Sequence, residues 1–164
     1  MGEPKRRDDL PDAEGLSEEN RKKAGKMIGT FGEETMKRFF SRNWGLREDA
    51  LKVIANEFEK EESKLRVQNP EKDLLSGAYG LIAYSLPDKI AQVATQGFKM
   101  LSHVESYFTK ERPGLNAMGH LQEPILTALN DRLGDSNPKL REMAEDSLLA
   151  LCEEDPDLIV RAVL

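Results

Sequence analysis

The stretch Leu46-Arg47-Glu48-Asp49-Ala50 returns as Leu140-Arg141-Glu142-Met143-Ala144, with Leu, Arg, Glu and Ala in the same places. Ile90-Ala91-Gln92-Val93-Ala94 fits the same frame through its first and last residues. The three frames begin at positions 46, 90 and 140, so they lie 44 and 50 residues apart. Stacked helical-hairpin repeats run about 40–47 residues. The first spacing therefore fits one repeat, and the second requires an additional linker.

The frames also share a helical pattern. Four positions beyond each alanine stands an apolar residue, Ile54, Phe98 or Leu148, which falls on the same helix face. An alanine one turn after a large aliphatic residue lets a partner helix approach closely. Each frame follows a short turn, and each turn follows another helical segment. The pattern predicts an all-α fold, an α-solenoid of HEAT-like helical hairpins. A helical bundle with chance similarities is the alternative.

The chain divides into a flexible leader, residues 1–16, and one repeat domain over residues 17–164, with about three helix pairs and the start of a fourth. We expect a helix from Ser17 with a break near Gly32, and a linker at residues 109–116. Further helices are expected over residues 33–41, 46–62, 71–84, 89–104, 121–133 and 140–152, with a last one opening at Asp155-Pro156. That last helix stops at Val163-Leu164 in mid-pattern, which favours either a longer array or a helix that folds back.

The composition restricts the function classes. The chain has 164 residues, a formal net charge of −6 and a single cysteine, Cys152. A net acidic chain lacks the basic face that nucleic-acid binding needs, and one cysteine alone makes neither an internal disulfide nor a zinc site. Phosphate-loop, nucleophile-elbow and zinc-protease motifs are missing. We therefore expect no enzyme, no cofactor and no bound metal.

The expected compartment follows from the N-terminal residues and the apolar runs. The first 14 residues are charged and lack the apolar run of a signal peptide. The segment Leu158-Ile159-Val160 is interrupted at once by Arg161, and no stretch is long enough to cross a bilayer. We expect a protein of the cytoplasm or cytoskeleton that has no membrane partner.

Two runs of residues carry a resemblance to a known family. The first is Phe31-Gly32-Glu33 together with Phe40-Ser41-Arg42-Asn43-Trp44-Gly45-Leu46-Arg47-Glu48-Asp49-Ala50-Leu51. It resembles the first repeat of a TOG domain, and more narrowly that of a ciliary-tip centrosomal protein. The second, residues 133–142, is similar to the middle of a HEAT repeat. The resemblance covers roughly residues 16–164.

The resemblance implies a function and a site. TOG domains are paddles of six HEAT repeats whose intra-repeat turns bind curved αβ-tubulin, so the implied partners are αβ-tubulin, microtubule ends, and other ciliary or centrosomal proteins. The implied location is the centriole or cilium tip. Carried over to this chain, the tubulin-binding residues are Trp44, Arg42, Asn43, Arg47, Pro87, Lys89, Asn137 and Lys139. The later turns of the family are absent from this sequence, and the second turn departs from the family pattern.

Structural roles for the same residues remain open. Trp44 can instead be a buried core residue, and Lys89 and Lys139 can be merely solvated. Arg47 and Arg141 occupy equivalent frame positions, which favours a repeated structural role, for example pairing with an acid such as Asp135. For the whole domain, one alternative is a HEAT scaffold that ignores tubulin and binds another protein in an apolar groove. Another is a catalytic or small-ligand domain, which would need a pocket with convergent polar groups.

Overall fold

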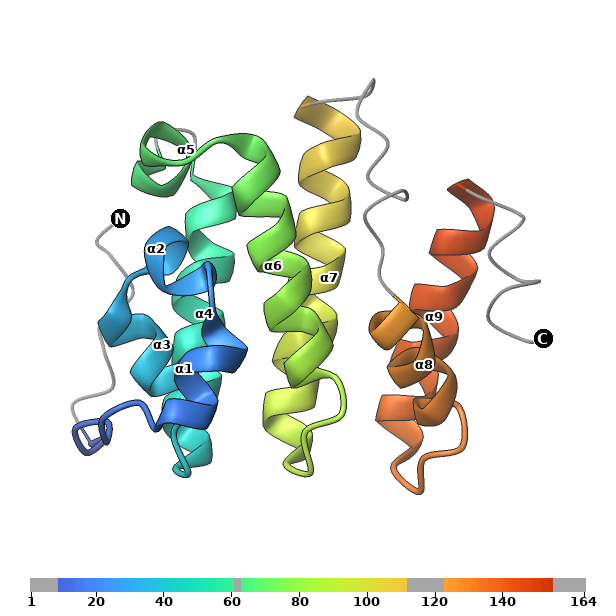
Figure 1. The fold of residues 1–164 in the computed structure, drawn as a ribbon. Coiled ribbons are helices and arrows are strands. Elements are labelled where there is room, and N and C mark those ends of the chain that lie inside the picture. Colours follow the sequence, from blue (N-terminus) through green and yellow to red (C-terminus); the bar gives the residue numbers. More distant parts are fainter. Residues whose placement is uncertain (1–8, 61–62, 112–122, 155–164) are drawn as a thin grey trace. The chain divides into compact units, whose positions relative to one another are not determined.

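The computed structural model describes residues 9–60, 63–111 and 123–154, and its regular structure within those ranges is entirely helical (Figure 1). The helices are α1 (Glu18–Ala24), α2 (Met27–Phe31), α3 (Glu33–Phe39), α4 (Trp44–Glu59), α5 (Lys64–Gln68), α6 (Glu71–Ser85), α7 (Ala91–Glu111), α8 (Glu123–Arg132) and α9 (Pro138–Glu154). The predicted all-α class is confirmed. The chain forms two compact units, residues 1–77 and 78–164, and the boundary lies within α6.

Glycines divide the first helical segment of the chain. The Ser17 side chain caps α1 by accepting a hydrogen bond from the backbone N–H of Asn20 at 3.1 Å. Gly25 then ends α1 with φ +48°, and Gly32 ends α2 with φ +94°. Both values lie where residues with a Cβ are strained. The break expected near Gly32 is confirmed, and Gly25 adds a break that the sequence pattern did not predict.

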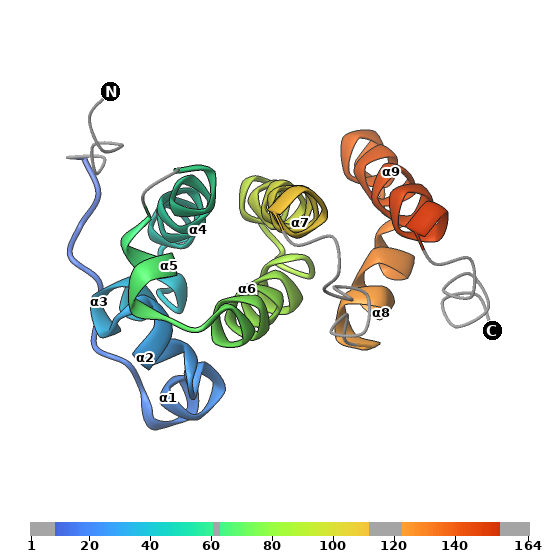
Figure 2. The ribbon, with the colours of Figure 1, turned by 90° about the horizontal axis from the view of Figure 1, so that it is seen from above.

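Within the first unit, α3 packs beside α4 as a hairpin (Figure 2). The buried side chains between these helices come from both, and they include Met36, Phe39, Leu46, Ala50, Leu51 and Ile54. Asp49 is 6% exposed, and its carboxylate lies 3.2 Å from Nη1 of Arg38 on α3. A buried carboxylate is costly unless it is paired or hydrogen-bonded, and this ion pair joins α3 to α4.

The second unit begins within α6 and contains the end of α6 followed by α7, and the helix pair α8–α9. The alanines of the repeated frame, Ala94 and Ala144, are fully buried, as Ala50 is in the first unit. Four positions further on, Phe98 is buried and Leu148 is half-buried. Ile90, the first residue of the second frame, is only half-buried and directly precedes α7. The small residue of each frame therefore lies in a fully buried position.

The structure corrects several expected boundaries. Residues 64–68 form α5, which has five residues and no buried side chain and therefore shows no apolar face in the sequence. Helix α7 continues to Glu111, so residues 109–111 of the expected linker are helical. Helix α4 ends at Glu59, before the expected residue 62. The remainder of the linker and the helix expected from Asp155 lie outside the described residues.

Replacing Gly97 with alanine should destabilise the protein. The new Cβ would lie 2.5 Å from Ser85 Oγ and 3.3 Å from the backbone nitrogen of Leu86, and Ser85 is buried. Such overpacking costs about 1–3 kcal/mol, while removing a glycine from a helix returns about 1 kcal/mol. We expect a net loss of about 1 kcal/mol in the free energy of unfolding, measured by urea denaturation.

Gly29 provides the matched control for that substitution. It lies on α2, and a Cβ built there meets nothing within 4 Å. Gly29→Ala should leave stability unchanged or raise it by up to about 1 kcal/mol. Equal effects at the two positions would contradict the close approach of α7 to the end of α6.

Candidate protein-binding site: the intra-repeat turns

The first turn, residues 40–43, connects α3 to α4 and is built by its own side chains. Asn43 caps α4, since its Oδ1 accepts hydrogen bonds from the backbone N–H groups of Gly45 at 2.9 Å and Leu46 at 3.4 Å. The backbone N–H of Asn43 in turn donates to Oγ of Ser41 at 3.0 Å. Trp44 is therefore held as the first residue of α4, with its side chain 39% exposed.

Arg47 locks this turn from within α4. Its Nη1 donates to the backbone carbonyl of Ser41 at 2.9 Å and to that of Arg42 at 3.1 Å. Hydrogen bonds from a charged guanidinium are stronger than those between neutral groups. Arg47 thus has a structural role in the first turn, while its predicted contact with a partner stays a prediction.

The third turn, residues 133–137, uses the same construction. Nη1 of Arg141 donates to the carbonyls of Asp135 at 2.6 Å and Ser136 at 3.3 Å, which lie six and five residues before it, as in the first turn. Asn137 Oδ1 accepts from the backbone N–H of Lys139 at 3.0 Å, and the Asn137 N–H donates to Oδ1 of Asp135 at 2.7 Å. Arg47 and Arg141 are therefore equivalent in geometry as well as in sequence. The acid expected beside Arg141 contributes its backbone carbonyl to this bond.

The second turn, residues 86–90, is held by an arginine from the following repeat. Arg132, the last residue of α8, donates from Nε to the carbonyl of Leu86 at 2.9 Å and from Nη2 to that of Asp88 at 2.6 Å. Its Nη1 also pairs with the Asp135 carboxylate at 2.6 Å, in a site where the two side chains are 13% and 20% exposed. Arg132 therefore links the second turn to the third.

The predicted contact residues divide by exposure. Arg42, Asn43, Trp44, Pro87, Lys89 and Lys139 are exposed, whereas Arg47 and Asn137 are half-buried. The first four predicted residues share the first turn and the start of α4 in the first unit. The remaining four belong to the second and third turns, which Arg132 connects within the second unit.

Sequence reasoning missed two residues that shape these turns. Glu14, in the expected leader, accepts hydrogen bonds from the Ser41 hydroxyl at 2.9 Å and from the Arg42 backbone N–H at 2.6 Å. No local pattern marks a residue that lies 27 positions before its partner. Arg132 precedes Asp135 by three residues, a spacing that hints at their ion pair but not at the bonds to the second turn.

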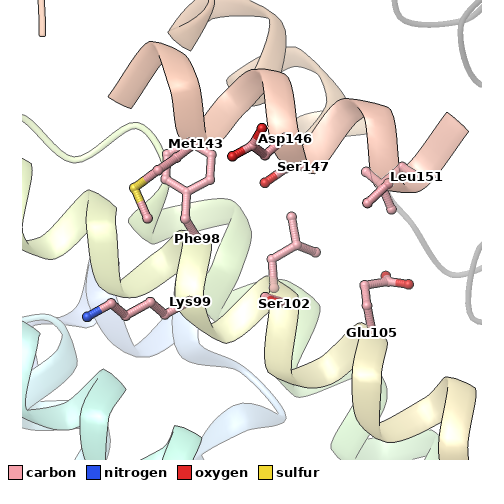
Figure 3. A pocket seen from close by; sticks show the side chains of 10 residues that line it. Phe98, Lys99, Ser102, Glu105, Met143, Asp146, Ser147 and Leu151 are labelled. Atoms are coloured by element: carbon pink, nitrogen blue, oxygen red, sulfur yellow. The ribbon is translucent and has the colours of Figure 1, made fainter. Parts of the chain in front are cut away.

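A cavity of about 340 Å³ opens between α7 and α9 in the second unit (Figure 3). Phe98, Met143 and Leu151 give it an apolar wall, and Glu105 and Asp146 lie on opposite sides. Its other lining residues are Lys99, Leu101, Ser102, Ser147 and Ala150.

Over the described ranges, no group of three or more His, Cys, Asp or Glu side chains is arranged to hold a metal. No helix there is long and apolar enough to span a membrane.

Arg132 should be required for full stability. Arg132→Lys keeps the charge but cannot supply three donors in a fixed fork, so the carbonyls of Leu86 and Asp88 lose partners. Hydrogen bonds to charged groups contribute about 1.5–3 kcal/mol, and we expect a loss of that order in urea denaturation. Arg21→Lys is the control, because Arg21 and Glu33 form an exposed pair, whose contribution is about 0–1 kcal/mol. Equal losses would contradict the linking role.

The Asp135 carboxylate should make stability depend on pH. The hydrogen bond from the Asn137 N–H and the bond from Arg132 hold the pKa of Asp135 below its usual range. A carboxylate whose pKa is lowered in the folded state stabilises the fold at a pH above its unfolded-state pKa, which is about 4. That stabilisation disappears as the pH falls through the folded-state pKa. We expect Tm to change little from this group above about pH 5 and to fall below about pH 4.

Asp135→Asn isolates this contribution. The variant should have a lower Tm at pH 7 and a flatter dependence of Tm on pH between 3 and 7. Glu145→Gln removes one negative charge from an exposed position of α9 and serves as the control. A profile of Asp135→Asn that runs parallel to the wild type would contradict the assignment.

Comparison with known proteins gives the family. Residues 21–155 match the family model described as "Centrosomal protein CEP104, TOG domain". The chain is 30% identical over 142 residues to the Centrosomal protein of 104 kDa of Mus musculus. The matched segment covers 85% of this chain and 15% of that protein. The Homo sapiens counterpart is 26% identical over 151 residues, with 88% and 16% covered. The chain thus spans about a sixth of the length of these relatives.

Solved structures agree with this assignment. "Structure of the TOG domain of human Cep104" superposes with a TM-score of 0.73 at 24% identity and covers 87% of this chain and 55% of that one. "CEP104 TOG domain" gives a TM-score of 0.71 at 28% identity, with 84% and 54% covered. These neighbours share the predicted helical-repeat fold. The chain belongs to the CEP104 TOG-domain family.

Proposed function

We propose that the chain binds αβ-tubulin through its intra-repeat turns, as part of a microtubule-associated protein. The observation that carries the proposal is Trp44, the only tryptophan, which is 39% exposed at a turn locked by Asn43 and Arg47. An exposed aromatic side chain on a rigid turn has the properties of an interface anchor, because little conformational freedom is lost on binding. A merely structural tryptophan would instead be expected in the core.

Charge supports an acidic partner. Arg42 is exposed beside Trp44, and Lys89 and Lys139 are exposed at the second and third turns. The arginines that hold the turns use donors on backbone carbonyls and, in the case of Arg132, also on the Asp135 carboxylate, so the exposed cations are better placed to meet a partner. Basic groups on a protein of net charge −6 would direct its approach to an acidic surface such as that of tubulin. Binding of this kind weakens as salt increases.

The family suggests the setting. The relatives are named centrosomal proteins, and we extend an association with the centrosome and cytoskeleton to this chain. The cilium tip and further ciliary or centrosomal partners are part of the same proposal. The function is a non-catalytic one of recognition, with no cofactor taking part.

A HEAT scaffold that does not bind tubulin is the second candidate. The observation in its favour is the cavity between α7 and α9, which has the apolar wall that such a scaffold would offer to another protein. The two candidates use different surfaces, since no residue of the turns lines this cavity. Failure to bind tubulin, with the fold intact, would leave the scaffold as the better candidate.

Trp44→Ala should weaken tubulin binding without unfolding the protein. Truncating an anchor residue costs about 2 kcal/mol or more, which corresponds to roughly a 30-fold increase in Kd. The measurement is co-migration of the chain with unpolymerised αβ-tubulin in size-exclusion chromatography at low and physiological salt, with circular dichroism to monitor the helices.

Val67→Ala is the matched control for that experiment. Val67 lies on α5 and is 85% exposed. Its replacement removes apolar surface at a position remote in sequence from the turns. We expect it to bind as the wild type does. If Trp44→Ala also loses its helical signal, Trp44 is a core residue and the anchor hypothesis is wrong.

A further inference from the structure

The expected leader makes two specific contacts with the first turn. We call residues 9–16 the strap. The Glu14 carboxylate accepts hydrogen bonds from the Ser41 hydroxyl at 2.9 Å and from the Arg42 backbone N–H at 2.6 Å. Leu10 lies against the start of α4, where a Cβ on Gly45 would come within 2.7 Å of Leu10 Cδ2. Both contacts fall on the turn that presents Trp44.

Comparison of the first and third turns shows that Glu14 supplies a carboxylate that the first turn itself lacks. Ser41 and Asp135 occupy equivalent positions, since each accepts a hydrogen bond from the backbone N–H two residues later. Each also offers its carbonyl to the arginine six residues later. The third turn therefore carries its own carboxylate, whereas the first carries a serine hydroxyl. Glu14 brings a carboxylate to the first turn from a distant part of the chain.

The groups that bind the Glu14 carboxylate favour its ionised form. One oxygen of Glu14 accepts an O–H donor and the other accepts a backbone N–H, and the Arg42 side chain adds positive charge nearby. The backbone bond from Arg42, followed by its own backbone N–H and the Ser41 hydroxyl, lowers the pKa of Glu14. The anionic form is therefore the one that this site prefers.

The strap is held in a way that permits exchange. Glu14 is exposed and Leu10 only half-buried, and the strap has no helix or strand of its own. Its bonds to the turn are open to competition from water and from other carboxylates. The site that it fills also adjoins exposed Trp44 and Arg42.

We infer that Ser41 and the backbone of Arg42 form a carboxylate-binding site, which Glu14 occupies within the free chain and which an acidic side chain of the protein partner occupies in the complex. The strap then competes with the partner for the first turn. The identity of that partner rests on the proposed binding of tubulin. If the site is open in about a tenth to a third of free molecules, removing the competitor tightens apparent binding about three- to tenfold.

The test uses Trp44 as a reporter and a glutamate-rich peptide as the carboxylate probe. Because Trp44 is the only tryptophan, its emission reports on the first turn alone. Glu14→Ala should bind the peptide about three- to tenfold more tightly than the wild type. Adding Ser41→Ala to that variant should reverse the gain, because it removes the hydroxyl donor. Circular dichroism confirms that each variant is folded.

Glu19→Ala is the matched control. It removes one negative charge from an exposed position of α1, where Glu19 pairs with Lys23 rather than with the turn. If Glu14→Ala binds no more tightly than Glu19→Ala, the effect is one of net charge and the inference is wrong. Weaker binding by Glu14→Ala would also overturn it, since Glu14 would then serve only to hold the turn in shape.

Repeating the series with αβ-tubulin separates the inference from the proposed function. A gain with the peptide but no tubulin binding by any variant would contradict the proposed function and leave the carboxylate site standing. Tubulin binding that is the same for Glu14→Ala and Glu19→Ala would support the proposed function and remove the strap as a competitor for the partner.

Discussion

The bond from an arginine guanidinium to the backbone carbonyls of a turn is the interaction on which the rest of this protein depends. Each of the three turns has one such arginine: Arg47 for the first, Arg132 for the second and Arg141 for the third. A turn between helices leaves carbonyl groups that have no helical partner, and a charged donor satisfies two of them at once. The turn is then rigid enough to hold the following helix cap and to present its exposed side chains in one arrangement.

Much of the fold could be predicted because it depends on patterns between residues that are close in the sequence. Burial of Ala50, Ala94 and Ala144 follows from their place in the repeated frame, and each is fully buried. The break at Gly32 follows from the freedom of glycine to adopt positive φ. Helix α5 could not be predicted, because a short helix without a buried face leaves no apolar periodicity. The length of α7 was hidden for a similar reason, since its last turn runs into a polar segment.

The candidate site was predictable only in part. The residues at the turns, such as Trp44 and Lys89, could be named from the repeat frame and the family resemblance, and the structure shows both exposed. What holds the turns could be anticipated only where the arginine belongs to the repeated frame. Arg132 acts across 44 and 46 residues of chain and Glu14 across 27 and 28. Contacts of that range depend on the folded arrangement, which no window of sequence contains.

The arginine bonds have a consequence for how the exposed surface of the turns can change. Apart from the ion pair between Arg132 and Asp135, they are made to backbone carbonyls, which every residue type supplies. Position 42 contributes its carbonyl to Arg47 and its N–H to Glu14, and position 136 contributes its carbonyl to Arg141. Substitutions at such positions can alter the charge and size of the exposed side chains while the turn keeps its shape. The exposed residues of the turns can therefore change independently of the residues that hold the turns in shape.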